Sequence, residues 1–384
     1  MIRSKISGVG YYVPDNIVKN SDLEEMMNTS DQWIKERTGI EERRWVDNDK
    51  LSTSLMGTYA SESAISDAGI DKNEIDFIIF STLSPDYYFP GSGVLLQRNL
   101  KIKEVGALDV RNQCSGFIYS LSIADQYIKS GMFKNILVVG SEIHSGGLDK
   151  TPRGRGVSVI FGDGAGAVVL SASDDDSGIL STHLHSEGKY AEELALIKPA
   201  TTFWIDKIID DENEDGTGYS PVMNGNFVFK NAVIRFEEVI YEALKHSSLK
   251  PDDISLLIPH QANLRISQYI QKRLKLSNSQ VYNNIMKYGN TTAASIPIAL
   301  KEALDENKLI ASREEILKPL RVVRESLEQN QCENIASGEL LDLMRRAKCF
   351  GINLARLDIR QESSRHSQLL AEIIKKKYKK NYLS

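Results

Sequence analysis

The sequence predicts a layered α/β fold with largely parallel sheets, organised as two similar halves. The first observation is that short apolar runs alternate with segments of helical periodicity, as residues 75–82 and 92–100 illustrate. Continuous apolar runs of this length are typical of strands buried on both faces, as in parallel sheets covered by helices. The second observation is that the same order of strand and helix returns after residue 177. Together they favour stacked layers of helix and sheet.

Each element is predicted from a local pattern. The first half has predicted strands at 6–14, 75–82, 106–110 and 135–140, and two more around a turn within 157–171. Its predicted helices are 22–27, a helix opened by the cap Ser30, 52–69, 92–100 and 117–128. The second half has predicted strands at 178–185, 254–258 and 281–285, and predicted helices at 229–245, 264–274 and 293–304.

Composition and charge exclude several functions. The chain has 384 residues, of which 41% are hydrophobic, so it can bury a large core. A net charge of −5 gives no electrostatic basis for binding nucleic acid or an anionic membrane. Three cysteines form neither a disulfide framework nor a zinc pattern, so we expect no metal site. Without a signal-peptide core or an apolar run of roughly 20 residues, a soluble cytoplasmic protein is expected.

Cys114 stands where the predicted strand 106–110 gives way to a predicted helix. Apolar residues recur at helical spacing from Phe117 to Ile128, so the sulfur lies near a helix N-terminus. Unpaired N–H groups and the helix dipole favour an anion there, and we therefore expect a lowered thiol pKa. The alternative is a buried structural cysteine, which is the commoner role for a single cysteine.

Two later segments argue against that alternative. His260 follows the apolar run 254–258, and Asn290 stands between a glycine turn and a predicted helix. Taken alone, His260 could be an ordinary strand-end histidine and Asn290 an ordinary helix cap. A cysteine, a histidine and an asparagine, each at a strand-to-helix junction, are together the groups needed for acyl transfer with carbanion chemistry.

Five segments, taken in order, carry a resemblance. They are 33–40 (WIKERTGI), the Cys114 segment 108–131, 160–167 (IFGDGAGA), 259–266 (PHQANLRI) and 288–295 (YGNTTAAS). They resemble the β-ketoacyl-acyl carrier protein synthase III family, the initiating condensing enzymes of the thiolase superfamily, over residues 1 to about 310. The resemblance implies a thiolase-like five-layer αβαβα fold with one half at 1–172, the other at 173–310, and the site between them. It also implies a homodimer.

The resemblance further implies a reaction in two halves. Cys114 takes a starter acyl group from coenzyme A, and the thioester is a substrate, so no cofactor is expected. Malonyl-acyl carrier protein then loses carbon dioxide, and the resulting enolate attacks the acylated cysteine. His260 and Asn290 would supply the two hydrogen-bond donors that the enolate oxygen needs.

Six further residues match positions with a role in this family. Four of them would bind coenzyme A: Trp33 and Arg155 would stack on its adenine, Arg37 would bind its phosphates, and Asn263 would line the pantetheine channel. Phe89 would reach an acyl pocket across the dimer interface. Arg265 would face the acidic carrier protein. For each, a surface or structural role is the alternative. Asn112 and Gln113 stand where the best-known members carry alanines, which leaves the starter length open.

The chain changes character after residue 310. In the family, two more strands and a glycine-rich loop follow the helix after Asn290, but residues 311–384 are arginine-rich and helical in pattern. Segments 315–321, 335–351 and 357–366 resemble an internal piece of phosphoenolpyruvate carboxylase, with Arg360 matching an active-site arginine. The rest of that site is missing, so we expect no carboxylation. The chain ends in a lysine-rich run at 375–380, typical of a solvated end.

Three functions stay open at this point. The first is a β-ketoacyl-acyl carrier protein synthase III that initiates fatty acid synthesis. The second is a related condensing enzyme or acyltransferase of secondary metabolism with the same three site residues. The third is a catalytically impaired hybrid chain, because replacing two strands of the second half is expected to remove core and one oxyanion donor.

Overall fold

The computed structural model describes residues 2–48, 50–174, 177–197, 220–306, 313–329, 335, 337–338 and 340–345. The chain divides into two compact units, Met1–Ala303 and Leu304–Ser384. Every predicted site residue lies in the first unit. The predicted division of that unit at residue 172 stays a prediction.

One five-stranded sheet organises the first unit. Its strands are β1 (Arg3–Tyr12), β4 (Phe77–Ser81), β5 (Gly106–Val110), β6 (Asn135–Glu142) and β7 (Gly164–Ser173), in the order β1-β7-β6-β4-β5. β4 is parallel to β5 and β6, whereas β7 is antiparallel to β1 and β6. Because β1 and β6 both run antiparallel to β7, the strands β1, β4, β5 and β6 share one direction, which confirms a largely parallel sheet with β7 as its exception. The segment between β6 and β7 has only the one-turn helices η3 (Pro152–Gly154) and α6 (Arg155–Ser158), and neighbouring strands joined without a helical crossover run antiparallel.

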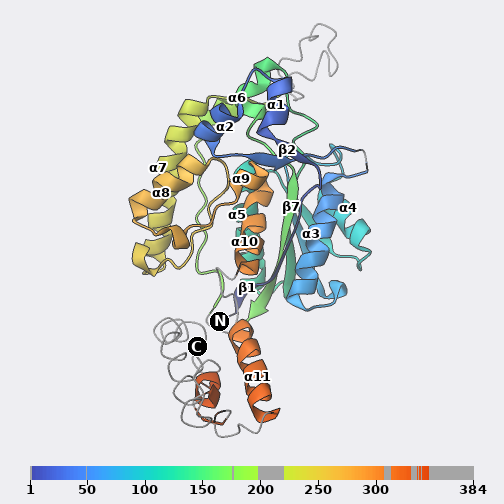
Figure 1. The fold of residues 1–384 in the computed structure, drawn as a ribbon. Helices are drawn as coiled ribbons and strands as arrows, with labels where there is room; N and C mark the ends of the chain where they lie inside the picture. The colour runs from blue at the N-terminus through green and yellow to red at the C-terminus, as the bar shows by residue number, and fades with distance from the viewer. Residues whose placement is uncertain are drawn as a thin grey trace. The chain divides into compact units, whose positions relative to one another are not determined.

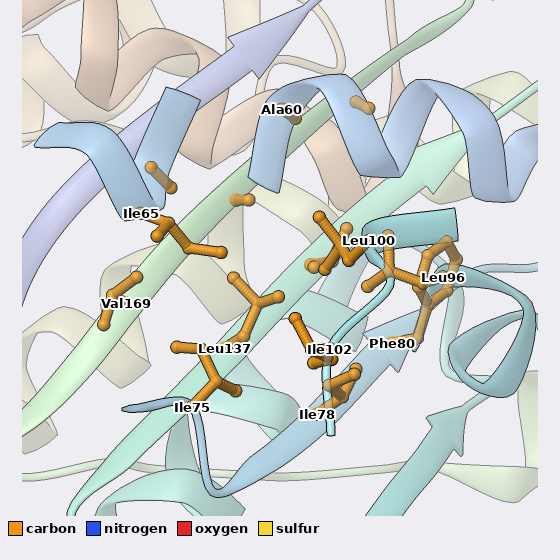
Figure 2. Close-up of a cluster of buried hydrophobic side chains, with 14 of the residues drawn as sticks. Ala60, Ile65, Ile75, Ile78, Phe80, Leu96, Leu100, Ile102, Leu137 and Val169 are labelled. Atoms are coloured by element: carbon orange, nitrogen blue, oxygen red, sulfur yellow. The ribbon is translucent and has the colours of Figure 1, made fainter. Parts of the chain in front are cut away.

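Helices cover both faces of this sheet (Figure 1). α3 (Thr53–Ala68) and α4 (Ser92–Leu100) lie on one face, and α5 (Gly116–Lys129) lies on the other beside α10 (Ser295–Asp305). The first face is the largest buried cluster, in which Met56 and Ala60 of α3 and Leu96 of α4 meet alternate residues of the strands (Figure 2). β6 and β7 are buried almost throughout, because both of their faces are covered.

Smaller elements surround this core. They are β2 (Ile17–Lys19), α1 (Asn20–Met26), α2 (Asp31–Thr38), β3 (Glu42–Arg44), α6 (Arg155–Ser158), β8 (Leu194–Ala195), β9 (Val222–Met223), α7 (Gly225–His246), α8 (Leu264–Leu274) and α9 (Ile285–Tyr288), with one-turn 3-10 helices between them. Ser30 caps α2 as predicted, since its Oγ accepts a hydrogen bond from the backbone N–H of Trp33 at 3.1 Å. The strand expected just before β7 is absent, because Phe161 forms only an isolated bridge with Asn290.

Among the residues that the structure describes, the second half of the unit forms helices and one small sheet, the antiparallel pair of β8 and β9. Helices α7, α8 and α10 confirm the three predicted there. The prediction of strands at 178–185, 254–258 and 281–285 was wrong, because these segments do not pair into a sheet. Their only strand pairing is a parallel bridge between Leu257 and Val281.

The topology of the first half explains this loss. β1, β4 and β5 alternate with α3, α4 and α5, and segments 178–185, 254–258 and 281–285 alternate with α7, α8 and α10 in the same way. β6 and β7 are the two strands that join β4 to β1. No described residue after 285 lies in a strand, so the described part of the chain holds no counterparts of these two joining strands. Only the counterpart of the β4–β5 pair can still form, and the bridge between Leu257 and Val281 is that pair.

Apolar side chains are left exposed as a result. Ile78, Ile79 and Phe80 of β4 are completely buried, whereas the corresponding run 254–258 is only partly buried. In segment 178–185, Leu180 is 53% exposed. This half of the unit therefore buries less apolar surface than the first half.

The second unit is described only in part. α11 (Arg313–Gln329) confirms the predicted helical character, and residues 340–345 are also helical. Arg360, Cys332, Cys349 and the lysine-rich run 375–380 lie outside the described residues. No helix within the described part of the chain is long and apolar enough to cross a membrane.

Candidate active site

The predicted position of Cys114 is confirmed. β5 ends at Val110, the one-turn helix η2 (Gln113–Ser115) carries the cysteine, and α5 begins at the next residue, Gly116. A side chain at Gly116 would collide with Ser81 of β4, so glycine lets the start of α5 approach the sheet closely. Gln113 has a left-handed backbone with φ 44°, which turns the chain sharply before the cysteine.

The expected lowering of the Cys114 pKa was wrong. Although Cys114 retains some exposed surface, burial of the thiol raises its pKa to about 12, and the nearby carboxyl of Glu142 acts in the same direction. A hydrogen bond with the Asn290 side chain opposes this shift but does not reverse it. Cys114 is therefore a protonated thiol at neutral pH, and it needs a proton acceptor before it can attack.

Asn290 is held beside Cys114 by three hydrogen bonds on its own backbone and side chain. Its N–H donates to the carbonyl of Ile160 at 2.8 Å, and its carbonyl accepts from Gly162 at 3.1 Å. Its side-chain Oδ1 accepts from the backbone N–H of Thr292 at 2.8 Å. With Oδ1 occupied, the amide Nδ2 is the end that is free to donate toward Cys114.

The Asn290 segment approaches Cys114 closely because β6 carries no side chain at the point of contact. Gly140 of β6 has no side chain, and any Cβ at this position would collide with the backbone of Ala293. Ala293 belongs to the one-turn helix η8 (Thr292–Ala294), which packs against both β6 and the Cys114 turn. Gly140 of the first half thus allows η8 of the second half to lie close to Cys114.

His260 is half-buried, and one of its ring nitrogens has a hydrogen-bond partner. Nδ1 lies 2.7 Å from Oγ of Ser295, and Nε2 is buried with no hydrogen-bond partner in the described part of the chain. Burial lowers the pKa of His260 to about 4, so the imidazole is neutral at neutral pH. A buried polar atom without a partner is costly, and a bound substrate oxygen can satisfy it.

Gln261, the residue after His260, holds this irregular segment in place through hydrogen bonds of its side chain. Gln261 is buried, and its amide Nε2 donates to the carbonyl of Pro259 at 2.7 Å. Its Oε1 accepts from the backbone N–H groups of Asn284 and Ile285 at 3.0 and 3.2 Å. These bonds tie the His260 segment to the segment that leads to Asn290.

Four predicted coenzyme A residues lie together. The guanidinium carbons of Arg37 and Arg155 lie 4.4 and 4.9 Å from the centroid of the Trp33 indole. Asn263 caps α8 and donates to the backbone carbonyl of Arg37 at 2.9 Å. Because Arg155 contacts the indole directly, it must move before an adenine can enter between the two.

Neither of the two remaining predicted residues contacts the indole, although the backbone N–H of Arg265 donates to Oδ1 of Asn263 at 2.9 Å. Phe89 is 82% exposed in the loop between β4 and α4. Arg265 is exposed at the start of α8, with its guanidinium carbon 5.3 Å from the ring centroid of Phe229 in α7. No cluster of three or more metal-binding side chains occurs among the described residues.

Several residues of the site were missed from the sequence. Ser295 and Thr292 lie inside segment 288–295, and their polar side chains among alanines were an available signal. Glu142 is buried at the end of β6, where it accepts hydrogen bonds from Ser84 and Thr82 at 2.6 and 3.1 Å. Burial raises its pKa to about 7. A lone carboxyl at the end of a strand gave no signal in the sequence.

Comparison with known proteins places this arrangement in a class. The description "3-Oxoacyl-[acyl-carrier-protein (ACP)] synthase III" belongs to a family model that matches residues 108–188, and the C-terminal model of the same name matches residues 244–317. The fold and site are those of a thiolase-like acyltransferase that forms carbon–carbon bonds. The second match extends slightly beyond the expected join near residue 310.

Individual relatives narrow this class to one family. The chain is 44% identical to the β-ketoacyl-[acyl-carrier-protein] synthase III of Aquifex aeolicus over 306 residues, which are 80% of this chain and 92% of the relative. It is equally similar to the enzyme of the same name from Aliivibrio fischeri, over the same shares of both chains. The chain belongs to the β-ketoacyl-acyl carrier protein synthase III family.

Solved structures confirm the thiolase-like α/β fold. The Aquifex aeolicus synthase matches with a TM-score of 0.72 at 43% identity, covering 80% of this chain and 92% of that one. The synthase of Thermus thermophilus matches with a TM-score of 0.71 at 36% identity, covering 80% of this chain and 92% of that one. The priming β-ketosynthase of the R1128 polyketide pathway matches with a TM-score of 0.71 at 30% identity, covering 80% of this chain and 89% of that one.

Proposed function

We propose that this chain condenses an acyl-coenzyme A starter with malonyl-acyl carrier protein, with Cys114, His260 and Asn290 as its catalytic residues. The observation that carries the proposal is the hydrogen bond between the Asn290 side chain and the Cys114 thiol, beside a neutral, half-buried histidine. In the first half-reaction, the sulfur of Cys114 attacks the thioester carbonyl, and the thiol proton passes to the departing sulfur of coenzyme A. Coenzyme A leaves as a thiol, and the acyl group stays on Cys114.

His260 acts as a donor in the second half-reaction. The backbone N–H of Gln261 points at Oγ of Ser295 at 3.4 Å, so we infer that the serine hydroxyl donates its proton to Nδ1 of His260. The single ring proton then resides on Nε2, the buried nitrogen without a partner.

Two hydrogen-bond donors of the site then bind the same oxygen of the malonyl thioester. The malonyl thioester carbonyl accepts from His260 Nε2 and Asn290 Nδ2, and negative charge develops on this oxygen as carbon dioxide leaves. The enolate carbon attacks the acyl carbonyl on Cys114, and the sulfur departs as the new carbon–carbon bond forms. Losing one such donor raises the barrier by about 2.7–4 kcal/mol.

Coenzyme A binding is assigned to the group formed by Trp33, Arg37, Arg155 and Asn263. Two guanidinium groups over one indole suit a ligand with an adenine and phosphates. Arg265 is proposed to contact the acidic carrier protein. No cofactor is proposed, because the coenzyme A thioester is consumed as a substrate.

A homodimer in the cytoplasm is part of this proposal. β5 pairs with β4 on one side only, so its other edge is unpaired by any described strand of this chain. Tyr87, Tyr88 and Phe89 in the loop after β4 are all more than half exposed. An open strand edge and exposed aromatic side chains are suited to contact with a second copy.

The segment after residue 310 is proposed to derive from an internal fragment of phosphoenolpyruvate carboxylase, as its motif around Arg360 suggests. The synthases of Aquifex aeolicus and Aliivibrio fischeri align with 306 residues, or 80% of this chain, and the remainder lies outside these alignments. We assign it no carboxylation activity, because the rest of that enzyme's site is absent. A transcript spanning codons 300–325 tests whether the join exists in the organism.

A second candidate is a condensing enzyme of secondary metabolism. It is favoured by Asn112 and Gln113 before Cys114, and by the similarity to the polyketide priming synthase. One experiment decides between the two and tests the whole proposal. The protein is incubated with acyl-coenzyme A of several lengths, digested, and the added mass is mapped. We expect acetyl on Cys114; a longer acyl group only supports the second candidate, and acylation only at Cys332 or Cys349 overturns both.

A further inference from the structure

His144 is a buried histidine that the proposed mechanism does not use. It lies two residues beyond the end of β6, and its ring packs against Phe161 with 4.8 Å between ring centroids. Its Nε2 lies 2.7 Å from Oγ1 of Thr292. Burial lowers the pKa of His144 to about 4, so this is a hydrogen bond between two neutral groups.

The partner of His144 has an unfavourable backbone conformation. Thr292 has φ 52°, which is a left-handed conformation that β-branched residues rarely adopt. Strain of this kind persists only where surrounding contacts hold the residue in place. Among the described contacts, the bond from His144 is the one that holds the Thr292 side chain.

The strained conformation has a consequence for Asn290. It directs the backbone N–H of Thr292 to Oδ1 of Asn290 at 2.8 Å. That bond decides which end of the amide faces Cys114, because Oδ1 can only accept and Nδ2 can only donate. If Thr292 relaxed to a right-handed conformation, its N–H would turn away and the amide could flip.

His144 is itself anchored from a different direction. Its backbone N–H donates to Oδ1 of Asp163 at 2.7 Å, and Asp163 also accepts from the backbone N–H groups of Ser145 and Val46 at 3.0 and 2.7 Å. Phe161, on which the His144 ring packs, forms the bridge that fixes the backbone of Asn290. Both the backbone and the side chain of Asn290 are thus tied to one rigid group.

We propose that His144 is a positioning residue that, through Thr292, orients the Asn290 amide so that Nδ2 faces the reacting atoms. The proposal rests on the proposed function of Asn290, and it assigns His144 no contact with substrate. A purely structural histidine would affect all steps equally. A positioning residue affects the steps that depend on the orientation of Asn290.

The test compares variants His144→Leu, Thr292→Val and the double variant in the full chain. We measure acetyl loading of Cys114 by intact mass, malonyl decarboxylation by the loaded enzyme, and the unfolding midpoint. Each single variant should lower decarboxylation about 10- to 100-fold while loading changes less than about threefold. The double variant should be no worse than the poorer single variant, because both remove the same bond.

Further variants and a second readout keep the test decisive. His144→Gln and Thr292→Ser retain a hydrogen bond and should recover most of the rate, and the matched control His183→Leu should change nothing. If His144→Leu fails to fold, the Thr292→Val and Thr292→Ser pair decides alone. Alkylation of Cys114 by iodoacetamide is independent of turnover, and it should slow in Thr292→Val as it does in Asn290→Ala.

The proposal is overturned if loading and decarboxylation fall equally in a stable variant, if neither falls, or if the single effects add. Failure of the unmodified chain to load Cys114 is a different result. It contradicts the proposed function, whereas the alkylation rates still report the orientation of Asn290.

Discussion

Nδ1 of His260 lies 2.7 Å from Oγ of Ser295, and the opposite ring nitrogen is buried without a partner in the described structure. Ser295 is the first residue of α10, whereas His260 lies in a segment without regular secondary structure before α8. One hydroxyl group therefore sets which ring nitrogen of His260 carries the proton, and several expectations depend on this contact.

Ser295→Ala should impair condensation selectively. Without the hydroxyl, the proton can occupy Nδ1, and Nε2 then becomes an acceptor that cannot bind the enolate oxygen. We expect decarboxylation by the loaded enzyme to fall about tenfold, which is the effect of one neutral hydrogen bond, with loading unchanged. Ser267→Ala is the matched control, because that buried hydroxyl has no partner and its loss should leave both rates unchanged.

The second half-reaction should not titrate with His260 near neutral pH. The pKa of His260 is lowered to about 4, so the ring stays neutral as the pH falls from 8 to 5. The same shift favours the folded state above about pH 6.5, and that contribution is lost as the pH falls toward 4. Decarboxylation by the loaded enzyme, measured from pH 5 to 8, should lack an inflection assignable to His260. An inflection near 6.5 that disappears in His260→Ala contradicts this assignment.

Alkylation of Cys114 should report its raised pKa. Since the thiolate is the reactive form and the pKa is raised to about 12, the rate with iodoacetamide should rise about tenfold per pH unit between pH 7 and 9. Asn290→Ala removes a bond that lowers this pKa, so it should slow the reaction at each pH. Digestion separates the Cys114 peptide from those of Cys332 and Cys349. A plateau below pH 8 would mean that the thiolate is stabilised after all.

Arg155→Ala should weaken the use of coenzyme A without changing the chemistry. Arg155 lies over the Trp33 indole, remote in sequence from the three proposed catalytic residues. We expect the KM for acetyl-coenzyme A to rise about tenfold while the loading rate at saturation stays the same. Arg153→Ala is the matched control, because Arg153 is exposed and pairs with Asp149 instead. Equal effects of the two variants would exclude a specific role for Arg155.

A chimera that supplies two further strands after residue 309 should be more stable than the present chain, and it should catalyse condensation faster. A chimera carries the end of the Aquifex aeolicus relative after residue 309 in place of the present segment. Covering a half-exposed leucine such as Leu180 contributes about 1 kcal/mol, and two joined strands add hydrogen bonds. We expect the unfolding midpoint to rise by at least about 5 °C and condensation to accelerate. A chimera with prolines within both added strands is the control. If the correct strands gain nothing over it, the present C-terminal segment is a working replacement.

The sequence by itself determined most elements of the first half and pointed to the three proposed catalytic residues. Strand 106–110 and helices 92–100 and 264–274 were predicted to the residue, because each is bounded by local signals such as glycine and a change of periodicity. Cys114, His260 and Asn290 were recognisable because each stands at the end of an apolar segment. Such local signals need no knowledge of the rest of the chain.

Only the tertiary structure decided the burial, the pKa values and the pairing of these residues and segments. The pKa of Cys114 is raised rather than lowered, because other segments of the chain bury the thiol and because Glu142, remote in sequence, lies near it. Segment 254–258 has the pattern of a strand but forms a single bridge, because a strand needs neighbours and the described residues supply no joining strands. His144 and Thr292 gain their relation to Asn290 from packing between β6 and η8. Burial and pairing are properties of the whole fold, and a local pattern does not contain them.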